Sequence, residues 1–168
     1  MTAIQDLVDR NTARPSSGPG PLVGQPSLRI AVVVCMDARI DPAQLLGLQP
    51  GEAHVIRNAG GVVTDDVIRS LAVSQRKLGT TEVMLIHHTK CGMATFTDEE
   101  FWSELEEAIG LRPTWAVETF RDTESGVRQS MERVRRSPFL TGTTAVRGFV
   151  VDVDTGDLAE VEVVPASW

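Results

Sequence analysis

The chain has 168 residues and 42% hydrophobic side chains, which suits one domain with a real core. Sixteen basic against twenty-three acidic side chains give a net charge of −7, so neither nucleic acid nor an anionic membrane is expected as a partner. The longest apolar run, Ile30 to Met36, is far shorter than the roughly 20 residues that cross a bilayer. The amino terminus lacks a signal-peptide pattern, so we expect a cytoplasmic protein.

The amino-terminal segment differs in composition from the rest. Residues 3–11 predict a short amphipathic helix, and residues 14–27 are rich in proline and glycine, which predicts an irregular arm. We therefore divide the chain into residues 1–27, a helix with a loose tether, and residues 28–168, an α/β body.

Strands and helices alternate through the body. Buried or alternating apolar runs predict strands over residues 29–34, 53–56, 81–87, 147–152 and 158–164. Cap and stop residues predict helices over residues 41–46, 64–78 and 124–136, and a further helix that begins near residue 97. Residues 154–157 are typical of a hairpin turn, whereas residues 110–122 fit no single element. The fold class expected is a single α/β domain with a mostly parallel central sheet flanked by helices, plus a C-terminal antiparallel strand or hairpin.

Three potential metal ligands lie where predicted buried strands end. Cys35 follows the first strand, and His88 and Cys91 follow the third; the chain has no other cysteine. Chemistry in open α/β sheets is found at such strand ends. Two thiolates and one imidazole make a three-ligand zinc set, which leaves a fourth tetrahedral position for water or for Asp37.

Each cysteine or histidine taken alone has a simpler interpretation. A lone cysteine at a strand end is most often a small buried hydrophobe. Asp37 and Arg39, however, lie two and four residues after Cys35, and charges beside a buried strand are costly unless they pair with each other or with a metal. A metal-assisted site therefore explains Cys35 better. His87 and His54 are assigned to the core rather than to the metal, since His87 should point opposite to His88 along a strand.

Residues Asn58, Ala59, Gly60 and Gly61 end the second strand on the same edge and are candidate pocket residues, because glycine lets backbone approach a ligand closely. Two other cysteine chemistries do not suit the spacing. A thiol phosphatase commonly has five residues between its cysteine and arginine, whereas Cys35 and Arg39 have three. A thioredoxin-like pair needs Cys-x-x-Cys, which is absent.

Three motifs in order carry a family resemblance. Cys35-x-Asp-x-Arg, then Arg57-Asn-Ala-Gly, then His88-x-x-Cys91 resembles the β-class carbonic anhydrases, over about the first two-thirds of the chain. Residues 30–42 and 54–78 most resemble the small microbial type. The resemblance implies zinc ligation by Cys35, His88 and Cys91, with Asp37 and Arg39 as a catalytic dyad and Asp37 as an additional ligand in a closed state.

The same resemblance implies an α/β fold and an obligate homodimer, or a dimer of dimers, in which residues 3–11 pack on the partner subunit. The expected reaction is the zinc-dependent, reversible hydration of carbon dioxide to bicarbonate and a proton. Two alternatives stay open: hydrolysis of carbonyl sulfide or carbon disulfide on the same scaffold, and a non-enzymatic zinc or redox sensor whose fourth position is filled by Asp37. The pocket residues of plant-type members have no counterpart here.

Overall fold

A five-stranded sheet lies at the centre of the computed structural model, which describes residues 2–14, 18 and 20–162. In spatial order its strands are β2 (Ala53–Asn58), β1 (Ile30–Cys35), β3 (Glu82–His88), β4 (Ala145–Val151) and β5 (Leu158–Glu160). The first four strands are parallel to one another, and β5 pairs with β4 in the antiparallel direction. The predicted fold class is confirmed.

The helices are α1 (Ala3–Ala13), α2 (Pro42–Leu46), α3 (Asp65–Leu78), α4 (Asp98–Ile109) and α5 (Thr123–Arg136), with short 3₁₀ turns η1 (Ala59–Gly61) and η2 (Gly92–Ala94). Sequence signals set their ends. Asp41 caps α2, Thr64 caps α3 and Thr97 caps α4 through their side-chain oxygens. Gly47 and Gly79 end α2 and α3 in the left-handed conformation.

Two predicted segments differ in detail from the structure. β5 ends at Glu160, whereas the predicted strand ran over residues 158–164; positions 163 and 164 lie outside the described residues. The ambiguous residues 110–122 contain no helix or strand among the described residues. Instead the Asp98 carboxylate accepts hydrogen bonds from the backbone N–H groups of residues 117–119, which fixes this loop against the start of α4.

The sheet has a hydrophobic core on each face. On one face α3 and α5 cover the sheet, and Leu71 and Val127 pack with Val33 and Leu85. The other core holds Val34 and Ile86 together with both cysteines. β1 is almost completely buried because both of its faces are covered, as its unbroken apolar sequence predicts. The cysteines therefore lie at the edge of a core and not on the open surface.

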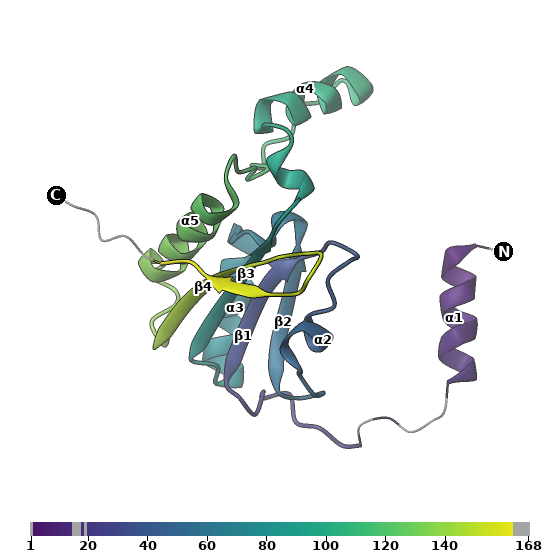
Figure 1. Ribbon diagram of the computed structural model, residues 1–168, viewed down its shortest axis with the longest axis vertical. Helices are drawn as coiled ribbons and strands as arrows, with labels where there is room; N and C mark the ends of the chain where they lie inside the picture. The colour runs from purple at the N-terminus through teal and green to yellow at the C-terminus, as the bar shows by residue number, and fades with distance from the viewer. Residues whose placement is uncertain (1, 15–17, 19, 163–168) are drawn as a thin grey trace.

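Helix α1 stands apart from this body, beyond the β2 side of the sheet (Figure 1). None of its residues is buried, and its apolar side chains Ile4, Leu7 and Val8 are 76%, 61% and 52% exposed. Their spacing places them on one helix face. Among the described residues, no helix combines the length and the apolar character that crossing a bilayer would require.

Gly61 is the residue at which backbone segments approach most closely near the strand ends. Its φ is +67°, and a Cβ atom there would lie 2.7 Å from the Cys35 nitrogen and 2.9 Å from the Ile86 oxygen. Both neighbours are backbone atoms of paired strands, so neither can move aside without breaking the sheet. Only glycine satisfies both the left-handed conformation and this contact.

We predict that Gly61→Ala destabilises the metal-free protein far more than Gly110→Ala. Gly110 has a similar φ of +72° with no atom within 4 Å of the added Cβ, so its substitution reports conformational strain alone. Strain should cost about 1–2 kcal/mol. At Gly61 the clash of the added Cβ atom should increase the loss in free energy of unfolding to roughly 2–5 kcal/mol in total. Denaturant unfolding measures both values, and equal losses would contradict the close-packing explanation.

Candidate metal centre

The three potential metal ligands meet at the carboxyl ends of two neighbouring strands. Cys35 is the last residue of β1 and His88 the last of β3, and these strands pair in parallel as far as Val34 and Ile86. Cys91 follows three residues after His88, just before η2. The Sγ atoms and an imidazole nitrogen lie within 4.8 Å of one another, and all three residues are buried.

His88 presents one nitrogen to this cluster. Its Nδ1 lies 2.8 Å from the Thr89 carbonyl oxygen, which can only accept, so Nδ1 carries the proton. Nε2 is buried and has no hydrogen-bond partner among the described residues. A buried nitrogen with a free lone pair is costly unless something binds it, and a backbone carbonyl on the opposite nitrogen is the usual way a metal-ligating histidine is oriented.

The two thiols share charge. The neighbouring Cys91 thiol lowers the pKa of Cys35 against the opposing effect of burial. The same interaction raises the pKa of Cys91 above its usual range, and burial adds to this effect. The shared proton favours the ionised form of Cys35, which is the form that binds a metal. Two sulfurs and one nitrogen at this spacing fit a tetrahedral zinc ion with one position left over.

The Asp37 carboxylate lies beside the ligand cluster. Its Oδ2 is 3.7 Å from His88 Nε2. Arg39 holds it from the other side: Nε donates to Oδ1 (2.9 Å), Nη2 donates to Oδ2 (2.7 Å), and the Arg39 backbone N–H donates to Oδ1 (2.9 Å). These bonds from Arg39 hold the pKa of Asp37 well below its usual range. The carboxylate therefore stays ionised and faces the ligand cluster.

The other histidines lie elsewhere. His87 is fully buried and its ring packs on Phe120 at 5.0 Å between centroids; burial lowers its pKa to about 4. His54 contacts Ser74 through Nδ1 (2.7 Å) and the Gly24 carbonyl through Nε2 (3.1 Å). Neither residue belongs to the group of ligand atoms that lie within 4.8 Å of one another.

The candidate pocket residues Asn58, Ala59, Gly60 and Gly61 border the centre. Asn58 pairs with Cys35 across the two strands, and its side chain donates to the Val62 carbonyl (2.8 Å). Gly61 packs on the Cys35 backbone. These contacts hold the strand end in place, and a role in lining a substrate pocket stays a prediction.

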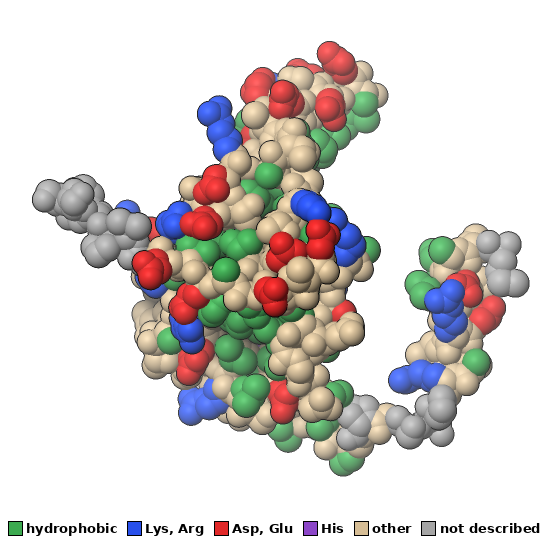
Figure 2. All heavy atoms as spheres, in the orientation of Figure 1, with side chains coloured by type: hydrophobic (Ala, Val, Ile, Leu, Met, Phe, Trp, Pro, Cys, Tyr) green, Lys and Arg blue, Asp and Glu red, His purple; other side chains and the backbone are tan. Residues whose placement is uncertain are grey.

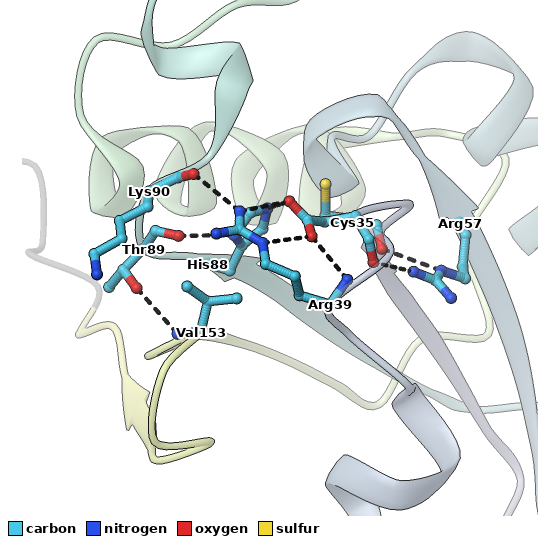
Figure 3. Close-up of polar contacts among 8 residues, drawn as sticks. Cys35, Arg39, Arg57, His88, Thr89, Lys90 and Val153 are labelled. Carbon is cyan, nitrogen blue, oxygen red and sulfur yellow. Dashed lines mark hydrogen bonds and ion pairs between the residues drawn. The ribbon is translucent and has the colours of Figure 1, made fainter.

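Three residues near the centre had no role in the sequence interpretation. The Lys90 carbonyl accepts from Arg39 Nη2 (3.2 Å), and Lys90 adopts a left-handed φ of +55°. Thr89 joins the centre to β4, because its hydroxyl accepts from the Val153 N–H (3.0 Å). Arg57 reaches the backbone after β1 (Figure 3). The position of a backbone carbonyl cannot be read from the sequence, so Arg57 in the second motif was the residue that sequence reasoning could have identified.

The comparisons with known proteins agree with this geometry. A family model described as carbonic anhydrase matches residues 30–158. The chain is similar to "Beta-carbonic anhydrase 1" of Mycobacterium tuberculosis, with 55% identity over 161 residues that cover 96% of this chain and 99% of the relative. A carbon disulfide hydrolase of an Acidianus species is 34% identical and covers 76% of this chain and 74% of its own.

Solved structures give the same result. The crystal structure of a carbonic anhydrase from Streptococcus mutans superimposes with a TM-score of 0.86 and 38% sequence identity, over 96% of this chain and 99% of that chain.

We predict that Arg39→Gln raises the pKa of Asp37 in the metal-free protein toward the ordinary value of about 3.9. The direction follows because Arg39 supplies the bonds that stabilise the ionised form. Carboxyl ¹³C shifts followed against pH measure it. Arg69→Gln, which removes an exposed partner of Asp66, is the matched control and should leave Asp37 unchanged.

The pairing of Asp37 with Arg39 should also make the stability of the fold depend on pH. A carboxyl with a depressed folded pKa stabilises the fold above about pH 3.9, and this contribution is lost as the pH falls through the folded pKa. The stability difference between wild type and Arg39→Gln should therefore shrink under acid. An unshifted Asp37 in the variant would contradict the pairing.

Proposed function

The chain belongs to the β-class carbonic anhydrase family, and we propose that it uses zinc, held by Cys35, His88 and Cys91, for the reversible hydration of carbon dioxide to bicarbonate and a proton. The observation that carries this proposal is the convergence of two buried sulfurs and an unpartnered imidazole nitrogen within 4.8 Å, beside an ionised carboxylate. Zinc in such a set acts as a Lewis acid that makes water nucleophilic near neutral pH.

Asp37 and Arg39 form the dyad that acts on water. The ionised Asp37 carboxylate can accept a hydrogen bond from a water molecule at the fourth position and thus orient its lone pair toward the substrate. Arg39 keeps the carboxylate in place through two side-chain bonds, so that it accepts from water and does not itself approach the ligand cluster. If Arg39 released it, Asp37 would be free to become the fourth ligand, which is the closed state.

The surroundings suit an apolar substrate. The cysteines belong to a core cluster with Val62, Met93 and Phe120, all buried. Carbon dioxide carries no charge and tolerates apolar surroundings, whereas bicarbonate is charged and loses its hydration there. Apolar side chains beside the ligands would therefore favour carbon dioxide over bicarbonate.

Two alternatives are separated from this reaction by measurement. Carbon disulfide hydrolases are among the relatives, and their reaction would use the same ligands and the same dyad. The higher identity and more complete coverage of the carbonic anhydrase relative favour carbon dioxide. A zinc or redox sensor would require Asp37 to occupy the fourth position permanently, which the two bonds from Arg39 oppose.

We also propose that two copies of the chain associate, as a homodimer or a dimer of dimers, with residues 1–27 reaching the partner and residues 28–168 forming the catalytic body. The support is α1, whose apolar face of Ile4, Leu7 and Val8 is exposed in a single subunit. An exposed apolar helix face is typical of an interaction surface. A cytoplasmic location stays a prediction from composition.

Zinc binding is the first test. Elemental analysis of the purified protein should give about one zinc per chain. Cys35→Ser and His88→Ala should lose most of this metal, because each removes one of only three protein donors. His54→Gln changes a half-buried histidine that lies outside the cluster and should retain the full amount. Absent metal in the wild type, or full metal in His88→Ala, would contradict the proposed ligand set.

Catalysis is the second test, by stopped-flow hydration of carbon dioxide. Asp37→Asn should lower kcat by about 10²–10⁴-fold, because the amide is a poor acceptor and loses the charge that Arg39 holds. Zinc content should be unchanged in this variant. Sulfide release from carbon disulfide, measured in parallel, should be slower than bicarbonate formation. Faster sulfide release would assign the protein to the other activity, and a zinc-loaded protein inert toward both would support the sensor.

Association through α1 is the third test. Leu7→Lys should weaken self-association by about 10- to 100-fold, because it places a charge in the buried centre of the contact. Gln5→Lys adds the same charge to the same helix outside the Ile4, Leu7 and Val8 face and serves as the control. Sedimentation velocity across a dilution series measures both. An unchanged assembly in Leu7→Lys would exclude α1 from the interface.

A further inference from the structure

Arg57 extends from β2 to the backbone that follows β1. It lies opposite Val34 in the parallel register, so its side chain is on the sheet face that carries the metal centre. Its Nε donates to the Cys35 carbonyl (3.1 Å) and its Nη2 donates to the Asp37 carbonyl (2.8 Å), as Figure 3 shows. One guanidinium thus ties together two carbonyls that flank Met36.

The backbone angles between these two carbonyls set the direction of the Asp37 side chain. The Cys35 carbonyl belongs to the peptide before Met36, and the Asp37 carbonyl belongs to the peptide after Asp37. The φ and ψ angles of Met36 and Asp37 lie between the two anchors. Because guanidinium is planar and its donors have a fixed separation, rotation of either residue would break one of the bonds. Hydrogen bonds from a charged donor are also stronger than neutral ones.

The turn has few other restraints on this side. Sheet pairing beyond Cys35 continues with one bond, from the Met36 N–H to the Asn58 carbonyl (2.8 Å). The Met36 side chain is 63% exposed, so core packing holds the turn only from Ile40 onward, which is buried. A bond from the Ile40 N–H to the Asp37 carbonyl (3.0 Å) closes the turn locally but does not connect it to the sheet.

We propose that Arg57 is a positioning residue for the metal centre, which holds the turn so that the Cys35 thiolate and the Asp37 carboxylate keep a fixed separation. The inference rests on the proposed function, since it concerns the same ligands and dyad. Arg57 touches neither sulfur nor carboxylate through the bonds described, and it acts through the main chain. Loss of the two bonds from Arg57 should therefore weaken metal binding and misalign Asp37, while the fold is retained.

The test uses Arg57→Gln, with Arg29→Gln as the matched control. Arg29 Nε also donates to a backbone carbonyl, that of Gly79 (3.0 Å), at the opposite end of β1. Three readouts apply to the full-length protein: zinc affinity by chelator competition, the visible absorption spectrum of the cobalt(II)-substituted protein, and kcat and KM for hydration. Circular dichroism and the melting temperature of the metal-free protein report on the fold.

Arg57→Gln should lose about 10- to 100-fold in zinc affinity or kcat, with a changed cobalt spectrum, whereas Arg29→Gln should match the wild type in all three. Arg57→Lys should recover only part, because an ammonium group is a point donor and cannot bridge both carbonyls in a fixed geometry. If Arg57→Gln does not fold, Arg57→Lys decides by the same readouts.

Two outcomes would overturn the inference: unchanged affinity, spectrum and kcat in the variant, or changes no larger than those of Arg29→Gln. Either result would leave the proposed function intact, provided that the wild type binds zinc and hydrates carbon dioxide. A wild type that does neither would instead refute the proposed function itself.

Discussion

Parallel pairing of β1 with β3 is the constraint on which the rest of the site depends. Side by side in one direction, the two strands finish at the same edge, so Cys35 and His88 meet although 53 positions separate them in sequence. Both strands are buried on their two faces, which excludes water from the first two ligands and makes an unpartnered imidazole nitrogen costly. The proposal of a metal therefore rests on this burial as much as on the chemistry of the donors.

The turn after β1 converts a metal site into a candidate catalytic one. Asp37 would be repelled by the thiolate of Cys35 if it stood alone, and Arg39 offsets this charge through paired hydrogen bonds. The Arg39 side chain also donates to the Lys90 carbonyl, so this hydrogen bond joins the loops that follow β1 and β3. The separation between carboxylate and ligand cluster is therefore a property of both loops together.

A single subunit exposes apolar side chains to solvent. Green side chains gather over the front of the sheet in Figure 2, and α1 presents a further apolar face at a distance from the body. Val55 on β2, at the edge of the sheet, is 42% exposed. A largely parallel sheet is normally covered on both faces, so the exposed Val55 on the edge strand and the detached helix are consistent with association.

The sequence by itself determined the elements and the ligand types. Caps and glycine stops located the helices, because those signals act over one turn, and the β-branched run before Cys35 identified a buried strand. The motifs predicted three donors, which the structure brings together, and a dyad whose catalytic role stays a prediction. The sequence could not determine which strands become neighbours, where α1 lies, or that Thr89 and Lys90 contribute backbone carbonyls. Strand pairing and the bond from Arg39 to the Lys90 carbonyl join residues far apart in the chain, and backbone carbonyls are groups that every residue carries, so only the tertiary structure decided these contacts.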